Sequence, residues 1–124
     1  MQVIKKDVAR VFDLPGVQFT PLVAPSLGSS EICAWLLTVE PGLDSGESHT
    51  LDREEVFLVL EGAIRLSEAG EVASAGDAVV VPAGEPIRLS NADSVPARVH
   101  VAIGAGFAAT MADGTPVGTP PWAV

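Results

Sequence analysis

The sequence has very few of the residues on which several common kinds of site depend. It contains one cysteine, Cys33, no tyrosine, and only two tryptophans and four phenylalanines among its 124 residues. A single cysteine cannot form a disulfide bond within the chain, and the apolar neighbours of Cys33 favour a small buried side chain over a reactive thiol. The scarcity of aromatic side chains argues against a surface that stacks nucleic-acid bases.

Basic residues are also few. The chain has seven Lys and Arg and sixteen Asp and Glu, which gives a formal net charge of −9. A surface of this charge repels phosphate backbones and anionic membranes. We therefore expect neither nucleic acid nor a membrane among the partners. No apolar run approaches the length of a membrane span, and no apolar signal segment follows Lys5 and Lys6, which predicts a cytoplasmic protein.

Apolar residues, in contrast, are abundant and make up 48% of the chain. A chain of this length suits one core, so we expect a single domain over residues 1–124. The segments 31–40 and 56–60 carry apolar residues at odd and even positions alike, so both faces of each strand need a cover. A second subunit is the simplest cover, and we predict a homodimer.

Short runs of β-forming residues, separated by turn signals, recur along most of the chain. Residues 17–23, 31–40, 56–60, 78–81 and 96–103 are predicted strands, and the strand at 78–81 is expected to be fully buried. Residues 2–14 fit either a short helix or an edge strand. Because no amphipathic helix of normal length is present, the pattern predicts an all-β fold, either an antiparallel sandwich or a barrel.

The most informative stretch is Pro41 to Gly62, which holds one of the two histidines and a glycine-terminated apolar strand. In an unbroken strand, alternate side chains share a face. One face would then carry His49, Leu51, Glu55, Phe57 and Val59. An imidazole and a carboxylate among apolar side chains predict the wall of a pocket.

Two motifs in this sequence resemble those of the cupin family. In the first, Glu55 and Gly62 have the family's spacing, with six residues between them, and His49 takes the first histidine position when the shorter spacing is used. Under the longer spacing the two histidine positions become Ser48 and Thr50. The second motif is matched by Gly76, Pro82, Gly84 and Asn91.

The resemblance implies a jelly-roll, or double-stranded β-helix, cupin barrel. Its core motifs would lie at 41–62 and 76–91, and the N-terminal segment 1–16 and the C-terminal tail 104–124 would pack on the barrel or on a partner subunit. The family's members include oxygenases, isomerases, epimerases and decarboxylases as well as sensors and auxiliary proteins.

At the positions where the family holds a metal ion, this sequence departs from the pattern. Leu51 occupies the second histidine position and Ile87 the third, so only His49 and Glu55 remain. A catalytic metal site usually needs at least three protein ligands. His100 is a possible substitute ligand, but it alternates with Val99, Val101 and Ile103, which form the better interior face. We expect no cofactor; the alternative is a divalent transition metal at His49 and Glu55.

Without a metal, a buried carboxylate must be paired or protonated. His49 lies six residues before Glu55 on the same predicted face and is its nearest candidate partner in the sequence. We therefore expect a hydrogen bond or an ion pair between them, whose loss would destabilise the protein.

The leading hypothesis is a small-molecule-binding cupin without a complete metal centre, with an auxiliary or sensor role in metabolism. The residues predicted to line its pocket are His49, Leu51, Glu55, Phe57, Ile87 and Leu89. The alternative is a cupin enzyme, either metal-dependent or using His49 as general acid or base and Glu55 to orient it. A third possibility is an interaction module whose barrel is filled by its own side chains.

Overall fold

Strands make up almost all the regular structure of the computed structural model, which describes residues 1–124. The elements are β1 (Phe12–Leu14), β2 (Val17–Val23), η1 (Pro25–Leu27), β3 (Ile32–Val39), β4 (His49–Leu51), β5 (Glu55–Glu61), β6 (Ala63–Ile64), β7 (Ala73–Ser74), β8 (Ala78–Val81), β9 (Ala97–Gly104), β10 (Ala109–Met111), β11 (Pro116–Gly118) and η2 (Pro121–Ala123). The helical segments η1 and η2 are single 3-10 turns, and no helix is long and apolar enough to cross a membrane. The all-β prediction is confirmed.

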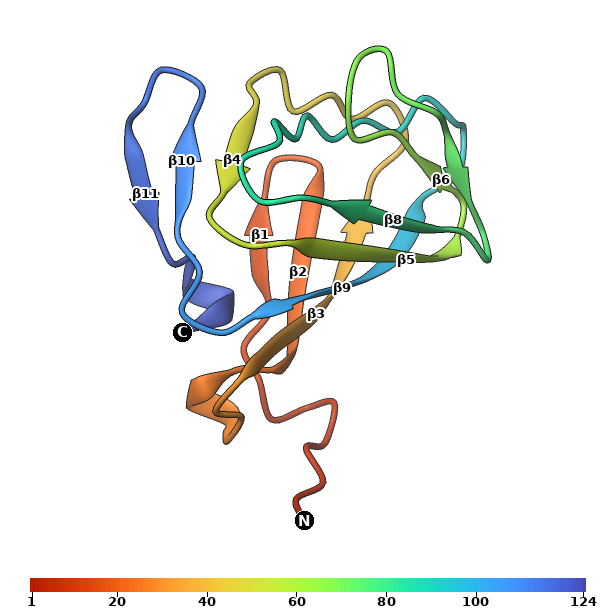
Figure 1. The fold of residues 1–124 in the computed structure, drawn as a ribbon. Coiled ribbons are helices and arrows are strands. Elements are labelled where there is room, and N and C mark those ends of the chain that lie inside the picture. The colour runs from red at the N-terminus through yellow and green to blue at the C-terminus, as the bar shows by residue number, and fades with distance from the viewer.

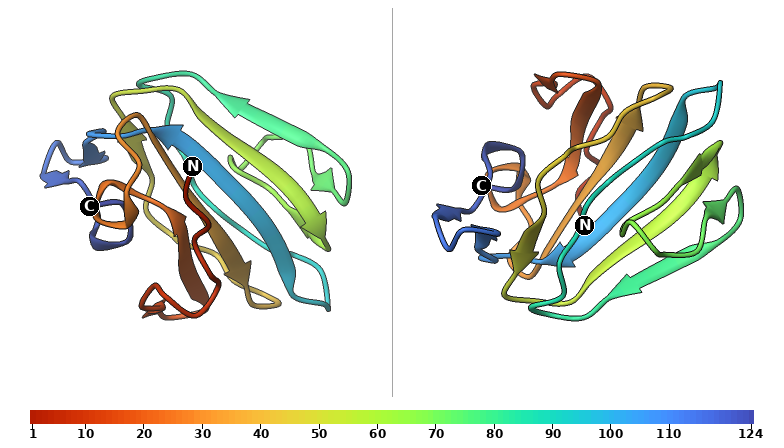
Figure 2. Two further views of the ribbon diagram at one scale, coloured as in Figure 1. Left: turned by 90° about the horizontal axis from the view of Figure 1, so that it is seen from below. Right: turned by 90° about the horizontal axis from the view of Figure 1, so that it is seen from above.

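One layer is a six-stranded antiparallel sheet in the order β1-β2-β3-β9-β5-β8 (Figures 1 and 2). Its central strand β9 pairs with β3 on one side and β5 on the other, so Trp35, Val101 and Phe57 form one cross-strand row. Alternate residues of these strands are buried on the inner face. The buried set consists of Cys33, Trp35, Leu37, Val39, Glu55, Phe57, Val59, Ala97, Val99, Val101 and Ile103.

The opposite layer is less regular and closes the barrel over this inner face. It contains the sheet β11-β10-β4 and the hairpin β6-β7, connected by isolated bridges such as His49 with Ile87 and Arg65 with Ser90. In Figure 1 the β10-β11 hairpin stands beside β4, with the C-terminus below it. The result is the two-layered jelly roll that the motifs implied.

The chain does not form one strand from His49 to Val59, as the sequence analysis assumed. It bends at Asp52 and Arg53, between β4 and β5. The Asp52 carboxylate accepts from the Ala108 backbone N–H at 2.9 Å, and the Arg53 guanidinium donates to the Ala105 carbonyl. These bonds hold the bend against the segment between β9 and β10. As a consequence, β4 and β5 belong to different sheets.

Two other local predictions also need correction. Residues 78–81 were expected to be fully buried, but β8 is an edge strand, and Val80 is 57% exposed because its side chain lies on the outer face of the sheet. Residues 2–14 form no helix; only Phe12–Leu14 are regular, as an edge strand paired with β2. The residues before them extend away from the barrel (Figure 1).

The C-terminal tail lies against the barrel. The Trp122 ring stacks on Phe19 with ring centroids 3.8 Å apart, and the Cys33 thiol donates to the Ala123 carbonyl at 3.3 Å. Cys33 is fully buried, and this burial raises the pKa of its thiol. The tail therefore contributes side chains to the interior of the barrel.

Candidate functional site

A cavity of about 310 Å³ lies inside the barrel, between the inner face of the six-stranded sheet and the opposite layer. Fifteen of its nineteen lining residues are hydrophobic. Leu14 and Val117, both about half exposed, are part of the wall, so the cavity meets the surface between the β1-β2 and β10-β11 hairpins. All six residues predicted to line a pocket are in this wall: His49, Leu51, Glu55, Phe57, Ile87 and Leu89.

Glu55 is the only acidic residue in the wall. It begins β5, where its backbone pairs with Val81 and Ile103, and only 4% of its surface is exposed. No side chain forms a hydrogen bond or an ion pair with its carboxyl group. Burial in these apolar surroundings raises the pKa of Glu55 to about 8, so the carboxyl is protonated at neutral pH.

His49 enters the cavity from the opposite layer. Its backbone exchanges hydrogen bonds with Ile87, at 3.1 Å from the His49 N–H and 2.8 Å from the Ile87 N–H. Burial lowers the pKa of the imidazole, which is therefore neutral at neutral pH. The cavity thus holds one neutral acid and one neutral base, with no fixed charge.

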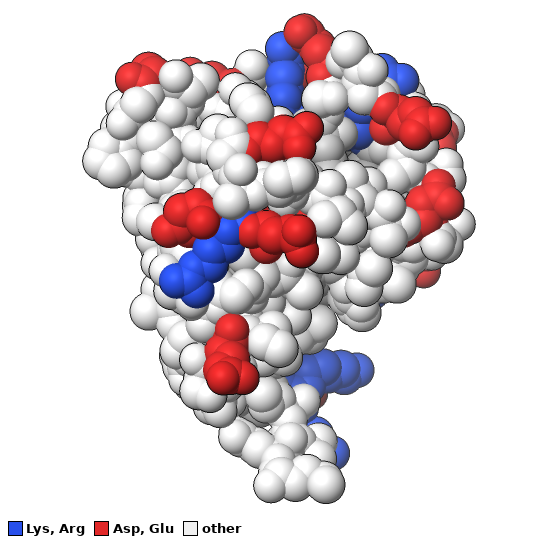
Figure 3. All heavy atoms as spheres, viewed as in Figure 1, with Lys and Arg blue, Asp and Glu red and all other residues white.

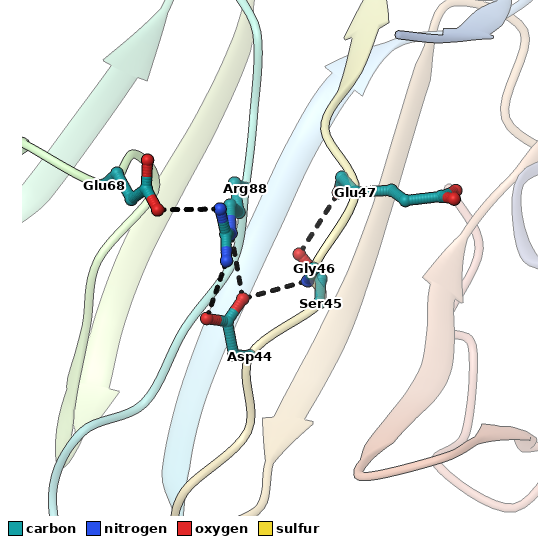
Figure 4. Close-up of polar contacts among 6 residues, drawn as sticks. All are labelled: Asp44, Ser45, Gly46, Glu47, Glu68 and Arg88. Atoms are coloured by element: carbon teal, nitrogen blue, oxygen red, sulfur yellow. Dashed lines mark hydrogen bonds and ion pairs between the residues drawn. The ribbon is translucent and has the colours of Figure 1, made fainter. Parts of the chain in front are cut away.

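Arg88 holds the loop before His49 in place through hydrogen bonds to two carboxylates. Arg88 donates two hydrogen bonds to the Asp44 carboxylate, at 2.9 and 3.0 Å, and a third to Glu68 at 2.9 Å (Figure 4). Asp44 also accepts from the Gly46 backbone N–H at 2.9 Å. The Arg88 guanidinium holds the pKa of Asp44 below its usual range. This exposed network connects the loop before His49 with Arg88, the residue that follows its partner Ile87, and none of its charged side chains lines the cavity.

The expected bond between His49 and Glu55 is not present. The pKa of each group is shifted by burial alone, and no hydrogen bond or ion pair connects them. The prediction failed because it assumed one continuous strand, whereas the bend at Asp52 places the two residues in different sheets. The same cavity brings them together, but each lies among apolar side chains.

The donor set does not fit a resident transition metal. His49 and Glu55 are the only His, Cys, Asp or Glu side chains in the wall, and no group of three or more such side chains could hold a metal ion. Leu51 and Ile87 are buried in the wall where the family has histidines. His100 cannot complete the set, because it lies on the outer face of the sheet, opposite Leu36 and Leu58.

Most of the aromatic part of the wall was not predicted from the sequence. Phe19, Trp35, Phe107 and Trp122 line the cavity together with the predicted Phe57. Trp35 packs against Phe107 with centroids 6.1 Å apart and meets Trp122 edge-on at 6.5 Å. These residues come from β2, β3, η2 and a loop, and no local motif connects them. They are spread along the chain from residue 19 to residue 122, so the sequence held no signal that they line one cavity.

A larger hollow of about 560 Å³ lies between β8 and the loop before β7. Its rim carries the exposed acids Glu71, Asp77 and Glu85, and no histidine or cysteine lines it. The barrel cavity is smaller, but it alone combines the buried acid with a histidine.

Comparison with protein families supports the motif assignment, because residues 35–103 match the family model described as the cupin domain. This match covers more than half of the chain. The chain belongs to the cupin family. The predicted resemblance is therefore confirmed, and the barrel described above is a cupin barrel.

Solved cupin-fold structures resemble this cupin over most of its length. A sugar phosphate isomerase of the cupin superfamily from Silicibacter pomeroyi is 26% identical, with a TM-score of 0.65 over 80% of this chain and 67% of that one. The polyketide cyclase RemF from Streptomyces resistomycificus is 17% identical, with a TM-score of 0.73 over 98% and 88%. KdgF from a Halomonas species is 20% identical, with a TM-score of 0.65 over 83% and 94%. No curated protein matches this cupin.

Two of the cupin motif residues that remain in this chain, Asn91 and Gly62, serve the fold. Asn91 is buried, and its amide donates to the carbonyls of Val39 and Val95, at 3.2 and 3.0 Å. Gly62 adopts a positive φ of 71° directly against the Pro96–Ala97 backbone. Of the motif positions, His49 and Glu55 are the ones that bring polar groups into the cavity.

Proposed function

We propose that this cupin binds a small, neutral and mainly apolar molecule inside its barrel, without a resident transition metal, in an auxiliary or sensor role in metabolism. The observation that carries the proposal is Glu55, which is buried without a partner in a mainly hydrophobic cavity of about 310 Å³. An apolar cavity with a few polar groups is the usual form of a small-ligand site. Neither Lys nor Arg lines the wall, so an anionic ligand would lose its hydration without compensation.

A pair of probes of the same shape tests this proposal. Naphthalene is neutral and 2-naphthoate is its carboxylate, and binding of each can be followed at neutral pH by saturation-transfer NMR. We expect naphthalene to bind and 2-naphthoate to bind at least about tenfold more weakly, because burial of an unpaired charge is unfavourable. Equal binding of the two, or binding of neither, would overturn the proposal.

A variant that fills the cavity locates the probe. Leu89 is a half-buried wall residue, so Leu89→Trp should abolish naphthalene binding. Val95→Trp is the matched control, because it places the same side chain on an exposed loop outside the cavity wall. Circular dichroism of both variants checks that the fold is retained. Unchanged binding to a folded Leu89→Trp variant would place the probe elsewhere.

The second candidate function is acid–base catalysis without a metal. It is favoured by the protonation states in the cavity, because the pKa of Glu55 is raised to about 8 and that of His49 is lowered. Near neutral pH the cavity therefore offers a proton donor and a proton acceptor, as general acid–base catalysis requires. Two of the similar structures are an isomerase and a cyclase, so this fold carries enzymes.

Deuterium exchange distinguishes a catalyst from a binding protein. The methyl protons of 2-acetylnaphthalene are enolisable, and a catalyst would exchange them in heavy water faster than buffer does. His49 would remove the carbon-bound proton while Glu55 donates its proton to the carbonyl oxygen. Exchange that is lost in both His49→Ala and Glu55→Gln would support catalysis. A ligand that binds without enhanced exchange would support the binding function alone.

We also propose that a second copy of this chain is the macromolecular partner. The outer face of the six-stranded sheet carries two adjoining rows of small or apolar residues and one histidine, and Leu58 is 44% exposed there. The rows consist of Ala34, Ala102, Val56 and Val80, and of Leu36, His100, Leu58 and Ala78. At one end Arg98 pairs with Glu61 at 3.3 Å, so the face has no net charge.

The rest of the surface explains why the partner would use this face. Acidic side chains are spread over the face of the molecule that Figure 3 shows, and the whole chain has sixteen acidic residues against seven basic ones. Two copies, each with a formal net charge of −9, repel one another wherever acidic surface meets acidic surface. The uncharged sheet face avoids this repulsion and is apolar enough to be buried in a dimer.

A further inference from the structure

We propose that the N-terminal arm of this chain, residues 1–11, binds to a second copy of the chain, in the hollow of about 560 Å³ between β8 and the loop before β7. We call this hollow the β8 groove. The inference goes beyond the ligand-binding function and adds a contact to the proposed dimer. It is carried by the charge and the few contacts of the arm, and by the charge and the unpaired strand of the groove.

The arm has few contacts with the rest of its own chain. Only one hydrogen bond connects them, from the Gln2 side-chain amide to the Leu27 carbonyl, and it is long, at 3.4 Å. Val3 and Val8 are 72% and 63% exposed. In Figure 1 the arm extends from the bottom of the barrel, whereas β8 and the loop before β7 lie in the upper part. The arm therefore points away from the groove of its own chain.

The arm is basic, although the protein as a whole is strongly acidic. It holds Lys5, Lys6 and Arg10, three of the seven basic residues, and only one acid, Asp7. The rest of the chain has fifteen acidic residues and four basic ones. No basic side chain of the arm forms an ion pair, whereas three of the four others do. An acidic surface is the complement of this arm.

The β8 groove offers the opposite charge next to apolar surface. It is lined by Glu71, Asp77 and Glu85 and by nine hydrophobic residues, with no lysine or arginine among them. Two of the apolar residues, Val72 and Val80, are 49% and 57% exposed. Acidic side chains beside exposed valines match an arm whose lysines directly follow a valine and an isoleucine.

The groove also contains the free edge of the six-stranded sheet. β8 (Ala78–Val81) pairs with β5 on one side and with no strand on the other. Alternate backbone N–H and C=O groups of β8 therefore have no strand partner. An extended segment can add to such an edge through main-chain hydrogen bonds. Residues 2–5 match the length of β8 and precede the turn in which the Val8 N–H donates to the Lys5 carbonyl at 3.1 Å.

The groove adjoins the face that we propose as the dimer interface. Ala78 and Val80 line the groove and also belong to the two rows on the outer face of the sheet. A second copy seated on that face would lie beside the groove, and eleven extended residues span up to about 40 Å. If each arm binds the groove of the other copy, the assembly closes as a two-fold dimer and does not grow into a chain.

Charge reversal in the full-length protein tests the pairing, with the dimer Kd measured by sedimentation at low salt. We expect Lys5→Glu with Lys6→Glu to weaken the dimer by about tenfold or more, because attraction to the groove becomes repulsion. Adding Glu71→Lys and Glu85→Lys to the same chain should restore most of the wild-type affinity, because the reversed arm then meets a reversed groove.

A matched control separates this pairing from the change in net charge. It combines the reversed arm with Glu40→Lys and Glu47→Lys, which alter two exposed acids outside the groove by the same total charge. This control should not restore the dimer. Equal restoration by the two combinations would show that only net charge matters and would overturn the inference.

A second measurement places the arm directly. Val8→Cys can carry a nitroxide label, while Cys33 is fully buried and stays unlabelled. When labelled chains are mixed with 15N-labelled wild-type chains, broadening reports only on contacts between copies. We expect the amide signals of Ala78 and Val80 to broaden. If the protein dimerises without this broadening, the inference is wrong and the dimer through the sheet face stands. A monomeric wild-type protein would contradict both, and neither result affects the ligand-binding proposal.

Discussion

Glu55 is the side chain whose chemical state depends most on the surrounding structure. In water a glutamate is ionised at neutral pH, but the apolar cavity raises the pKa of Glu55 to about 8. No neighbouring charge contributes to this shift, since burial is its only cause. The carboxyl is therefore a neutral donor in the folded protein and an ionised group in the unfolded chain.

This difference predicts how stability depends on pH. Because the folded protein holds the proton more tightly, its free energy of unfolding should fall as the pH rises from about 4.5 through about 8. Glu55→Gln removes this dependence, so the variant should gain several kcal/mol relative to the wild type between about pH 5 and about pH 9, at about 1.4 kcal/mol per unit of pKa shift. Urea unfolding of both proteins across this range is the measurement. Parallel profiles would show that Glu55 is ionised in the fold.

His49 provides a second test at the same scale. Because no hydrogen bond joins the imidazole to Glu55, His49→Ala should leave the pKa of Glu55 raised and reduce the free energy of unfolding by only about 1 kcal/mol. Carbon-detected NMR titration of the Glu55 carboxyl, together with urea unfolding, checks both expectations. A return of this pKa to the usual range of a glutamate would show that the two groups are coupled.

At the scale of elements, glycines set the turns that connect the strands. Gly62 and Gly76 both have positive φ, at 71° and 94°, but their surroundings differ. A Cβ at Gly62 would lie 2.6 Å from the Pro96 carbonyl oxygen and 2.9 Å from Ala97 Cα, whereas nothing lies within 4 Å of a Cβ at Gly76. The turn at Gly62 therefore brings the end of β5 against the start of β9.

The two glycines form a matched pair for mutation. Gly62→Ala and Gly76→Ala should each cost about 1–2 kcal/mol for the left-handed backbone conformation. Gly62→Ala should cost about 2 kcal/mol more, because its methyl group collides with backbone that can move only with the strand. Thermal or urea unfolding measures the difference. Equal losses would mean that the contact with Pro96 is not tight.

At the scale of the whole molecule, the outer face of the six-stranded sheet predicts the oligomeric state. We expect sedimentation of the protein at about 50 µM to show a dimer, and Leu58→Lys to dissociate it by burying a charge in the interface. Val117→Lys is the control, because Val117 is similarly exposed but lies on β11, outside this face. A monomeric wild-type protein, or equal effects of the two variants, would contradict the proposal.

Much of the fold could be predicted from the sequence, because its signals are local. The strand at 17–23 has the predicted bounds, and those at 31–40, 56–60 and 96–103 differ by only a residue or so at either end. The alternation of residues along 96–103 also correctly predicted that the His100 side chain lies on the outer face. The edge position of 78–81 was missed, because an apolar run reads the same in a central strand and in an edge strand that displays apolar residues.

The sequence predicted which polar residues line the candidate site, but not how they lie relative to one another. The alternation of side chains along a strand predicted that His49 and Glu55 lie on a common pocket wall, and both line the cavity. The bend at Asp52 could not be foreseen, since it depends on bonds to Ala105 and Ala108, more than fifty residues along the chain. Cytoplasmic location, the absence of a cofactor and the homodimer remain predictions.

The sequence by itself determined the family, the all-β fold and the loss of two metal-ligand positions, because spacing and residue type are enough to show each of these. Only the tertiary structure decided that Glu55 lies in an apolar cavity and that it has no partner there. Those facts depend on which side chains meet across the barrel. Burial and hydrogen bonding are properties of such long-range neighbours, and no local pattern encodes them.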